Sequence, residues 1–485
     1  MTTTSDTHRP WPLLRRFALP ALCGAVFAAI MAWFQPRGPV TSAETIALLA
    51  GGLAVGLLTG ATARSRWAIL LAPMAFLIVF ELLRLDSALP TVGPLNASSA
   101  FGVLAFVLGR IVVWPLACLS IIAGTLWGIG GPGRRVGVIV LTVLLALIAA
   151  SLLLPASPPP LKDADGRPIE GQVAELIPVE LNGHEQWIEV RGAREDLPIV
   201  LYLSGGPGQS DLAYSRALFE PLTDDFLVVG WDQRGTGKSY PALDAEGLTL
   251  EGSVADTIEL ARWLTEHYGR QKVYLLGESW GSLLGVLAVR QQPELFHAFI
   301  GSGQMVAPLE TDEGIYRDLI TTAMGSGHGE LVARLATMGP PPYRSVFDYA
   351  TIMSHYPLLE GGYIPPAEYL RRGQQSNLGP YGVFGQEYSP IEKVSVLRGL
   401  LDVFSQLYPQ LQDVDLRRDA AALEVPVLVL AGEHELAART EPAREWYELL
   451  AAPDKQWVDL ADAGHSVAFE HADELHRLLL EFEEQ

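Results

Sequence analysis

The sequence predicts a chain in two parts, a domain of membrane-spanning helices followed by an α/β domain in which helices flank a mostly parallel sheet. Three observations predict this fold class. Long apolar stretches fill the first third of the 485 residues, strand-like and helical segments alternate from Glu175 onward, and a Gly-x-Ser-x-Gly motif around Ser279 follows one strand-like segment. Such alternation is typical of parallel strands that helices cover on both faces.

Five apolar stretches precede residue 155, and each is near the roughly 20 residues that cross the hydrocarbon core of a bilayer. They cover residues 17–34, 45–62, 67–85, 101–127 and 136–154. A cleaved signal peptide would contain only one such stretch. We therefore expect residues 1–154 to form an all-helical transmembrane domain of about five spans, with the lipid bilayer as its partner.

Arginines lie mostly on one side of the expected spans. Seven of them precede the first span or lie between the second and third or the fourth and fifth: Arg9, Arg15, Arg16, Arg64, Arg66, Arg134 and Arg135. The other connections contain Arg37 and Arg84. By the positive-inside rule this distribution puts the N-terminus in the cytoplasm. An odd number of spans then predicts an integral plasma-membrane protein whose second part is extracytoplasmic, whereas an even number would leave that part in the cytoplasm.

Two charged residues interrupt the apolar stretches. Glu81 lies in the third stretch and Arg110 in the fourth. The long fourth stretch is also compatible with one span plus a re-entrant piece, so the number of spans is the weakest part of this prediction. Charged side chains inside a membrane domain either satisfy each other or mark a transport path, and the sequence leaves both interpretations open.

The two parts of the chain differ in charge. Up to Pro160 there are ten arginines, no lysine and four acids, a net charge of +6, whereas the remainder holds 24 basic and 51 acidic residues, a net charge of −27. A domain this acidic repels phosphate groups, which excludes nucleic acid as an expected partner. The proline-rich run that ends at Pro160 is typical of a stiff spacer, and we interpret residues 155–170 as a linker.

From residue 171 the pattern is that of an α/β domain. An antiparallel pair of strands is expected to turn at Asn182-Gly183. Continuous apolar runs, typical of buried parallel strands, cover residues 199–203, 226–230, 273–276, 299–301 and 425–430. Helical patterns separate them at residues 254–268, 283–290 and 441–450. Active sites in such folds lie at the carboxyl ends of the strands, so the loops after the strands are the expected positions of functional residues.

Residues 306–423 do not follow this alternation. The interval is rich in tyrosine, proline and glycine, as in Gly379-Pro380-Tyr381, and has helical patterns at residues 315–323 and 391–408. An insertion of that length between two core strands is usually a lid or cap. We therefore expect a core made of residues 171–305 and 424–485, with a helical cap at residues 306–423 inserted between its two parts.

The motif around Ser279 reads Gly277-Glu278-Ser279-Trp280-Gly281. A serine on a tight strand-to-helix turn needs glycine two residues before and after it, because side chains there would collide with the neighbouring strand or helix. Ser279 is therefore the candidate nucleophile. The Trp280 N–H and the glycines of Ser204-Gly205-Gly206-Pro207-Gly208, which follows another strand, are the candidate oxyanion hole.

A serine nucleophile needs a base and a carboxylate that orients the base. His465, in Ala463-Gly464-His465-Ser466 after the strand-like residues 456–460, is the candidate base, and His434 is its rival. Glu435, which follows the apolar run at residues 425–430, is the candidate acid. Serine, acid and histidine then occur in the order known for a Gly-x-Ser-x-Gly elbow. This chemistry requires no metal and no organic cofactor.

Four segments together resemble the α/β-hydrolase fold and, within it, the proline iminopeptidase family. They are residues 204–208, residues 231–239 (Trp-Asp-Gln-Arg-Gly-Thr-Gly-Lys-Ser), residues 277–282 and residues 463–466. Two positions depart from the family pattern. Ser204 replaces the usual histidine, and Glu435 replaces the usual aspartate three residues after a glycine, here Gly432. The resemblance does not extend to residues 1–160.

The resemblance implies release of an N-terminal residue, often proline, from a short peptide. It also implies that Asp232 and Arg234 support the site, and that acidic groups near the cap hold the ammonium group of the substrate. Four glutamates are candidates for that last role: Glu278, Glu310, Glu313 and Glu387.

We therefore expect a membrane-anchored serine hydrolase whose substrate is a small peptide or ester. His465, oriented by Glu435, would deprotonate Ser279 as it attacks the carbonyl, and water would resolve the acyl-enzyme. One alternative is an esterase, lipase or thioesterase acting on membrane-derived substrates. Another is a receptor or transport component that binds without catalysis. Dehalogenases and epoxide hydrolases are disfavoured because they use aspartate at the position of Ser279.

Overall fold

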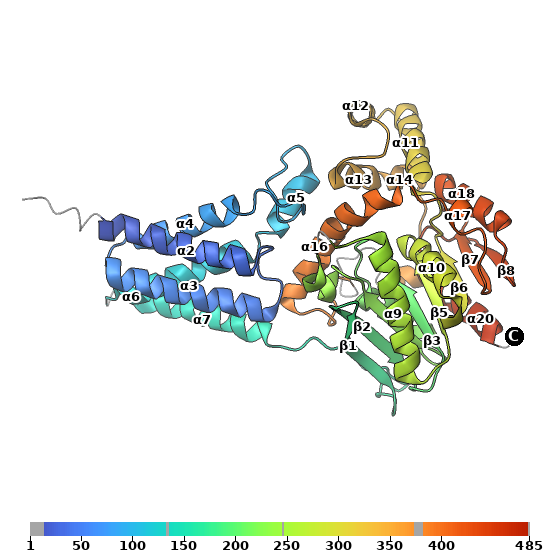
Figure 1. Cartoon of the computed structure of the whole chain (residues 1–485), viewed down its shortest axis with the longest axis horizontal. Coiled ribbons are helices and arrows are strands. Elements are labelled where there is room, and N and C mark those ends of the chain that lie inside the picture. The colour runs from blue at the N-terminus through green and yellow to red at the C-terminus, as the bar shows by residue number, and fades with distance from the viewer. Residues whose placement is uncertain (1–13, 132–134, 245–246, 373–381, 484–485) are drawn as a thin grey trace, which may run out of the picture. The chain divides into compact units, whose positions relative to one another are not determined.

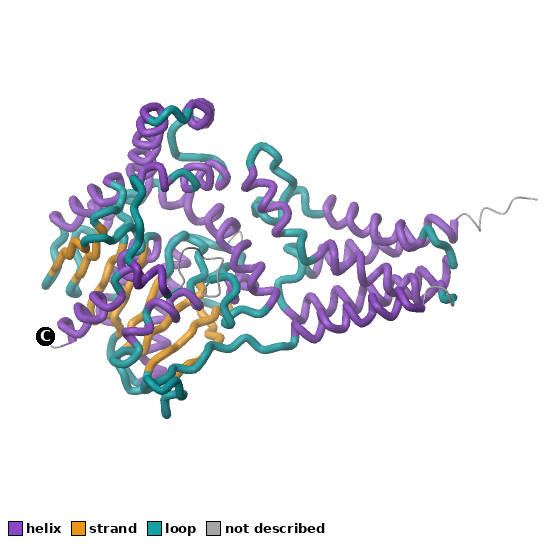
Figure 2. Tube along the Cα trace, turned by 180° about the vertical axis from the view of Figure 1, so that it is seen from behind, coloured by secondary structure: helices purple, strands orange, loops and turns teal. Residues whose placement is uncertain are grey.

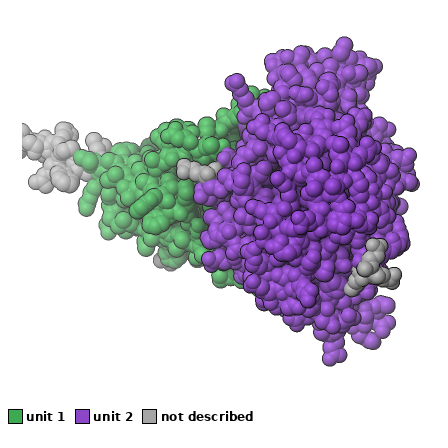
Figure 3. Space-filling model, turned by 45° about the vertical axis from the view of Figure 1, so that its right-hand side comes forward, with its two compact units in different colours: residues 1–155, 389–391 green, residues 156–388, 392–485 purple. Residues whose placement is uncertain are grey.

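The computed structural model describes residues 14–131, 135–244, 247–372 and 382–483. The chain divides into two compact units (Figure 3). Residues 1–155 with 389–391 form the first unit, and residues 156–388 with 392–485 form the second. Arg9, Arg134 and the segment Gly379-Pro380-Tyr381, which enter the sequence predictions, lie outside the described residues.

The first unit is helical, and each stretch expected to span a membrane is helical in it. Its elements are η1 Leu14–Ala18, α2 Leu19–Phe34, α3 Ser42–Ala63, α4 Ala68–Leu82, α5 Ala100–Leu108, α6 Val113–Ile129 and α7 Arg135–Leu152. The fourth stretch forms two helices, α5 and α6, and the angle between them is 41°. Helices α2, α3, α4, α6 and α7 lie side by side, and α5 lies beyond one end of this bundle (Figure 1).

Length and hydropathy separate the helices that could cross a bilayer from the shorter apolar ones. Within the described residues, the segments Leu14–Phe34 and Ser42–Ala63 are each long and apolar enough to cross a bilayer, and the bent pair α5–α6 is a third if it forms one span. Helix α4 and residues Val136–Ser151 of α7 are apolar but shorter. The number of five spans therefore stays a prediction.

Glycines bring α3 and α6 into backbone contact. Gly52, Gly56 and Gly60 lie one turn apart on α3, and a Cβ atom on Gly56 would lie 2.1 Å from the Ile121 carbonyl oxygen. From the other side, a Cβ atom on Gly124 would lie 2.1 Å from the Leu53 carbonyl oxygen. Small residues at these positions allow the two helices to pack closely, as is common in membrane helix pairs.

Glu81 and Arg110 bind each other, which is one of the two interpretations that the sequence left open. Arg110 Nη2 lies 2.6 Å from Glu81 Oε2, and Trp114 Nε1 donates to the other carboxylate oxygen over 2.9 Å. The Arg110 guanidinium also donates to the carbonyl oxygens of residues 91–93. These contacts tie α4, α6 and the segment that precedes α5.

The second unit contains one sheet of eight strands in the order β1-β2-β4-β3-β5-β6-β7-β8. The strands are β1 Val173–Leu181, β2 His184–Gly192, β3 Ile199–Leu203, β4 Leu227–Asp232, β5 Val273–Glu278, β6 Phe296–Ser302, β7 Val427–Gly432 and β8 Lys455–Leu460. Strand β2 pairs antiparallel with β1 and β4, and all other neighbours pair in parallel. The predicted mostly parallel sheet and the hairpin turn at Asn182-Gly183 are therefore confirmed.

Helices cover both faces of the sheet, as the two opposite views show (Figures 1 and 2). Alternate strand residues such as Tyr202 and Leu276 pack against α8, α19 and α20. Leu275 and Phe299, which point the other way, pack against α10 beside α9. The helices are α8 Leu212–Leu218, α9 Leu250–Tyr268, α10 Trp280–Gln291, α18 Ala437–Leu449, α19 Val467–Glu470 and α20 Ala472–Glu483. Short 3₁₀ helices are η3 Glu220–Leu222, η4 Gly237–Ala242, η5 Pro293–Leu295 and η6 Tyr408–Leu411.

The interval between β6 and β7 is helical, as the irregular sequence pattern there predicted. It contains α11 Pro308–Gly325, α12 Gly329–Met338, α13 Val346–Met353, α14 Tyr356–Leu359, α15 Ala367–Arg371, α16 Pro390–Leu407 and α17 Leu416–Asp419. Because it leaves the sheet after β6 and returns before β7, this insertion lies next to the carboxyl ends of the central strands.

Candidate active site

Ser279 lies on a sharp turn between β5 and α10. Its backbone has φ +52° and ψ −115°, a region that residues other than glycine rarely adopt. A Cβ atom on Gly277 would lie 2.4 Å from the Gly281 carbonyl oxygen, and one on Gly281 would lie 2.1 Å from the Leu203 carbonyl oxygen. The motif therefore requires both glycines for the steric reason inferred from the sequence.

The glycine-rich loop after β3 lies against this turn. A Cβ atom on Gly205 would be 3.5 Å from the Cβ atom of Ser279, and Gly206 and Ser279 line the same cavity. Gly206 has φ +112°, which favours glycine there. Trp280 begins α10, so its N–H is one of the free donors at the helix N-terminus. The structure thus brings together the three residues predicted to form an oxyanion hole: Gly205, Gly206 and Trp280.

Gln233 connects the two halves of this arrangement. Its Oε1 accepts a hydrogen bond from Trp280 Nε1 over 3.0 Å, and its Nε2 donates to the Ser204 carbonyl oxygen over 3.2 Å. Sequence reasoning assigned Gln233 no role, although it stands between Asp232 and Arg234 in one of the segments that carried the resemblance. It holds the turn and the glycine-rich loop in register.

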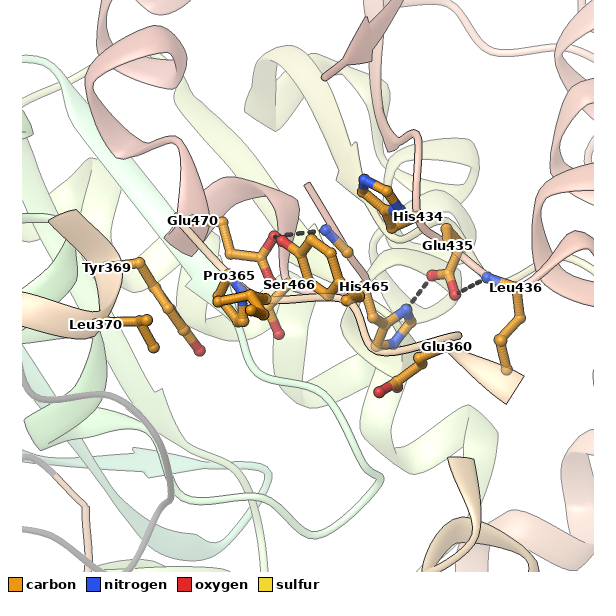
Figure 4. Close-up of a pocket in the computed structure, with 13 residues that line it drawn as sticks. Glu360, Pro365, Tyr369, Leu370, His434, Glu435, Leu436, His465, Ser466 and Glu470 are labelled. Carbon is orange, nitrogen blue, oxygen red and sulfur yellow. Dashed lines mark hydrogen bonds and ion pairs between the residues drawn. The ribbon is translucent and has the colours of Figure 1, made fainter. Parts of the chain in front are cut away.

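His465 and Glu435 are joined by a hydrogen bond between His465 Nδ1 and Glu435 Oε2 (Figure 4). The other carboxylate oxygen accepts from Leu436 N over 2.7 Å and from Arg439 Nη1 over 3.1 Å. Burial alone would raise the pKa of Glu435, but the charges of His465 and Arg439 and these hydrogen bonds lower it to about 2. The carboxylate is therefore ionised at neutral pH and faces the imidazole.

The rival histidine occupies a different position. The ring of His434 stacks on that of Tyr363, with 4.7 Å between the ring centroids. Tyr363 also donates to the Asp462 carbonyl oxygen over 2.9 Å. His434 thus packs against the inserted segment, whereas His465 pairs with Glu435.

Ser279 and His465 line one small cavity of about 50 Å³. Its other walls include Gly206 from the glycine-rich loop, and Asp312 and Ile315 from α11. The arrangement places a hydroxyl, an imidazole and Gly206 of the candidate oxyanion hole around a common space, which suits acyl transfer to a serine.

Asp232 is the last residue of β4, and Arg234 lies in the loop that follows it. Asp232 is fully buried, and its carboxylate accepts from Lys238 N over 2.8 Å and from the Tyr388 hydroxyl over 3.2 Å. Arg234 binds the carboxylate of Asp256 on α9 through two hydrogen bonds of 2.9 and 2.6 Å. Both side chains fix the loop after β4, in keeping with the support role that the resemblance implied.

The four glutamates considered for the substrate ammonium lie elsewhere. Glu278 is buried and accepts from Ser466 Oγ over 3.1 Å, and burial raises its pKa well above the ordinary range. Glu310 pairs with Arg417, and the buried Glu387 pairs with Arg216. Glu313 lies half-buried on α11. None of the four is among the described residues that line the small cavity.

Asp312 is the acid that lines the cavity, and sequence reasoning did not find it. Its Oδ1 accepts from the Tyr408 hydroxyl over 2.9 Å. Its Oδ2 is buried and accepts no hydrogen bond within 3.5 Å from the described residues. Burial raises the pKa of Asp312 to about 7, although Tyr408, Gln412 and Arg439 oppose the shift. The site therefore contains a carboxyl oxygen that lacks a donor.

Residues 198–472 match the sequence profile of the alpha/beta hydrolase fold family. The chain belongs to this family. The match covers more than half of the chain and includes Ser279, Glu435 and His465 of this alpha/beta hydrolase. It begins after the first unit, so the family assignment concerns the second unit.

Two curated relatives of this alpha/beta hydrolase are named as peptidases. "Probable aminopeptidase YbaC" of Bacillus subtilis (strain 168) is 27% identical over 301 residues, which cover 62% of this chain and 93% of that protein. A proline iminopeptidase of Neisseria gonorrhoeae is 36% identical over 129 residues, or 26% of this chain and 39% of that protein. The second match thus spans less than half of its relative.

One solved structure is also similar. The crystal structure of a proline iminopeptidase from Mycobacterium smegmatis has 19% sequence identity and a TM-score of 0.44, and the similarity covers 64% of this chain and 97% of that one.

Proposed function

We propose that this alpha/beta hydrolase is a membrane-anchored serine aminopeptidase that releases N-terminal residues, proline among them, from short peptides. The observation that carries the proposal is the shared cavity of Ser279 and His465, with Glu435 bound to the far nitrogen of His465. The aminopeptidase names of the relatives support the choice of reaction.

The proposed reaction is acyl transfer in two steps. His465 accepts the proton of Ser279 as the serine oxygen attacks the amide carbonyl, and the oxyanion is stabilised by N–H groups at Gly205, Gly206 and Trp280. His465 then protonates the leaving amine. Water repeats the sequence on the acyl-enzyme and releases the free amino acid. Glu435 stabilises the imidazolium that forms in each step.

Asp312 is the proposed anchor for the substrate amine. An ammonium group in the small cavity would supply the donor that Asp312 Oδ2 lacks. A buried carboxyl without a partner is costly, and a cation beside it favours the ionised form. A requirement for a free N-terminal amine follows from this contact.

The Asp312→Asn variant is expected to lose about 10²-fold in kcat/KM for prolyl p-nitroanilide, because a charged partner of the amine is removed. Hydrolysis of p-nitrophenyl acetate, which has no amine, should change less than about threefold. The two substrates should be compared in one preparation of the full chain. Equal losses on both substrates would contradict the role of Asp312.

The same variant is expected to be more stable than the parent at alkaline pH. The pKa of Asp312 is about 7 in the folded chain, whereas a carboxyl group in the unfolded chain has a pKa near 4. Stability is therefore lost as the pH rises from 4 to 7, and asparagine avoids this loss. The free energy of unfolding should rise by roughly 2–4 kcal/mol at pH 8 and stay unchanged at pH 4.

The esterase, lipase or thioesterase alternative is tested by the same substrates. If acyl esters are hydrolysed and a free amine gives no advantage over its N-acetylated form, the peptidase proposal fails while the serine hydrolase proposal stands. The non-catalytic alternative predicts that a fluorophosphonate probe does not label the intact chain.

Anchoring in the membrane rests on the first unit. Two long apolar helices and a bent pair support spans. We adopt the odd number of crossings that the sequence predicts. The arginine distribution then favours a hydrolase unit on the outer side.

Reporter fusions test this topology. Fusions of alkaline phosphatase after residue 160 are expected to be active, and fusions after residue 66 inactive, because the phosphatase folds only outside the cytoplasm. The opposite pattern would place the hydrolase unit in the cytoplasm and overturn the predicted localisation.

A further inference from the structure

A second, larger cavity of about 520 Å³ lies beside His465 (Figure 4). One wall is the segment of residues 360–370 that follows α14 and runs into α15, and the other walls are the loops after β7 and β8. We call it the outer cavity. Its lining includes Tyr363, Ile364, Leu370 and Leu436, so much of its surface is apolar.

The wall formed by residues 360–370 is fixed to the loop that carries His465. Tyr363 donates to Glu470 Oε2 over 2.7 Å, and the same oxygen accepts from Gly464 N over 2.6 Å. A Cβ atom on Gly464 would lie 2.7 Å from the Tyr363 ring, so the two segments are in direct contact. The outer cavity is therefore held open between structured walls on both sides of His465.

His465 lines both cavities, whereas Ser279 lines only the small one. In acyl transfer the acyl group bonds to the serine, and the histidine that took the serine proton delivers it to the leaving amine. The acyl part of a substrate thus belongs in the small cavity with Ser279. The leaving part has to lie next to His465 on its other side, where the outer cavity begins.

The charge of the outer cavity is negative. Glu360, Glu435 and Glu470 line it, and the described lining residues include no lysine or arginine. The carboxylates of Glu435 and Glu470 accept the hydrogen bonds described above. The carboxylate of Glu360 forms no hydrogen bond or ion pair with another described residue, and Figure 4 shows it near the ring of His465. The outer cavity therefore offers a carboxylate beside apolar surface.

We propose that the outer cavity binds the leaving part of the substrate and that Glu360 makes it select peptides with lysine or arginine directly after the scissile bond. The methylene groups of such a side chain pack on the apolar wall while its cationic end pairs with Glu360. This inference rests on the proposed aminopeptidase function and adds the class of its peptide substrates.

The test uses the purified full chain in detergent at low salt. Three dipeptide amides are compared. Each begins with the N-terminal residue of the aminoacyl p-nitroanilide that the chain hydrolyses fastest, and the second residue is lysine, glutamine or glutamate. We expect kcat/KM to fall in that order, with about tenfold between lysine and glutamate. In Glu360→Gln the ratio should fall below about threefold, and in Glu360→Lys it should invert. Hydrolysis of the anilide, whose leaving group is uncharged, should stay within about threefold of the parent in Glu360→Gln.

Glu433→Gln is the matched control, because Glu433 is an exposed glutamate two residues before Glu435 that does not line the outer cavity. It should leave the lysine to glutamate ratio unchanged. Equal rates for the three dipeptides in a chain that cleaves the anilide would overturn the inference alone. A loss in Glu360→Gln that is equal for all substrates would assign Glu360 to the chemistry instead and also overturn it. A chain that cleaves neither anilide nor dipeptide would refute the proposed function, and the inference with it.

Discussion

Replacing Ser279 with alanine is expected to lower kcat/KM for prolyl p-nitroanilide by about 10⁴- to 10⁶-fold and to abolish labelling by a fluorophosphonate probe. The hydroxyl is the only proposed group that forms a bond to the substrate, so nothing else in the site replaces it. Alanine has the same Cβ atom as serine and accepts the φ of +52° no better and no worse. Thermal unfolding of the variant should therefore match that of the parent.

Ser282→Ala is the matched control for Ser279→Ala. Ser282 lies one turn further along α10, and its hydroxyl donates to the Ser279 carbonyl oxygen over 2.6 Å and accepts from Met305 N over 2.9 Å. These hydrogen bonds give the Ser282 hydroxyl a structural role. The Ser282→Ala variant should therefore keep its labelling by the fluorophosphonate probe. The assignment of the nucleophile would be wrong if labelling persisted in Ser279→Ala, or if it disappeared in Ser282→Ala alone.

Replacing Glu435 with alanine is expected to lower kcat by about 10⁴-fold, with a small change in KM. The carboxylate has a pKa of about 2 and stays charged throughout the usual assay range, so it stabilises the imidazolium of His465 at every pH of interest. Without it the imidazole loses both its orientation and that stabilisation. Steady-state kinetics of the purified variant measure the effect.

Asp462→Ala is the comparison for Glu435→Ala. Asp462 is another acid close to His465 along the chain, in a backbone conformation with φ +55°. Its carbonyl oxygen, and not its carboxylate, takes part in the described network through Tyr363. We expect the turnover of Asp462→Ala to stay within about threefold of the parent. Near-normal turnover in Glu435→Ala together with a large loss in Asp462→Ala would reverse the assignment of the acid.

The sheet could be predicted from the sequence because buried parallel strands are continuous apolar runs. The start of β6 is one place where the observed and predicted bounds differ. Strand β6 begins at Phe296 and not at the predicted residue 299, since the exposed His297 interrupts the apolar run. Helix α9 begins at Leu250 because Thr249 caps it by accepting from Gly252 N over 3.0 Å. Local polar contacts of this kind have little effect on hydrophobic periodicity.

The loops of the candidate active site could be predicted because close backbone approaches require glycine at particular positions. Ser279, His465 and Glu435 each follow a strand, and Gly277 and Gly281 leave a readable motif. These steric requirements concern residues that are neighbours in the chain, so a single sequence is enough to reveal them.

The groups that surround the substrate could not be predicted in this way. Asp312 becomes a cavity residue through contact with Tyr408, 96 positions further along the chain. The segment that carries Glu360 faces His465 only because Tyr363 is bound to Glu470, 107 positions away. Contacts of such separation depend on how the inserted helices pack, which no local pattern encodes.

The glycines shared by α3 and α6 bear on how the first unit selects its own contacts. In a bilayer, lipid chains are as apolar as leucine, so burial of apolar surface does not distinguish one helix neighbour from another. Steric fit does, because the absence of a Cβ atom at Gly56 lets the backbone of α6 at Ile121 approach α3 to within contact. Glycine acts here as a recognition residue, and the pairing of α3 with α6 is specified by absent side chains and not by attractive ones.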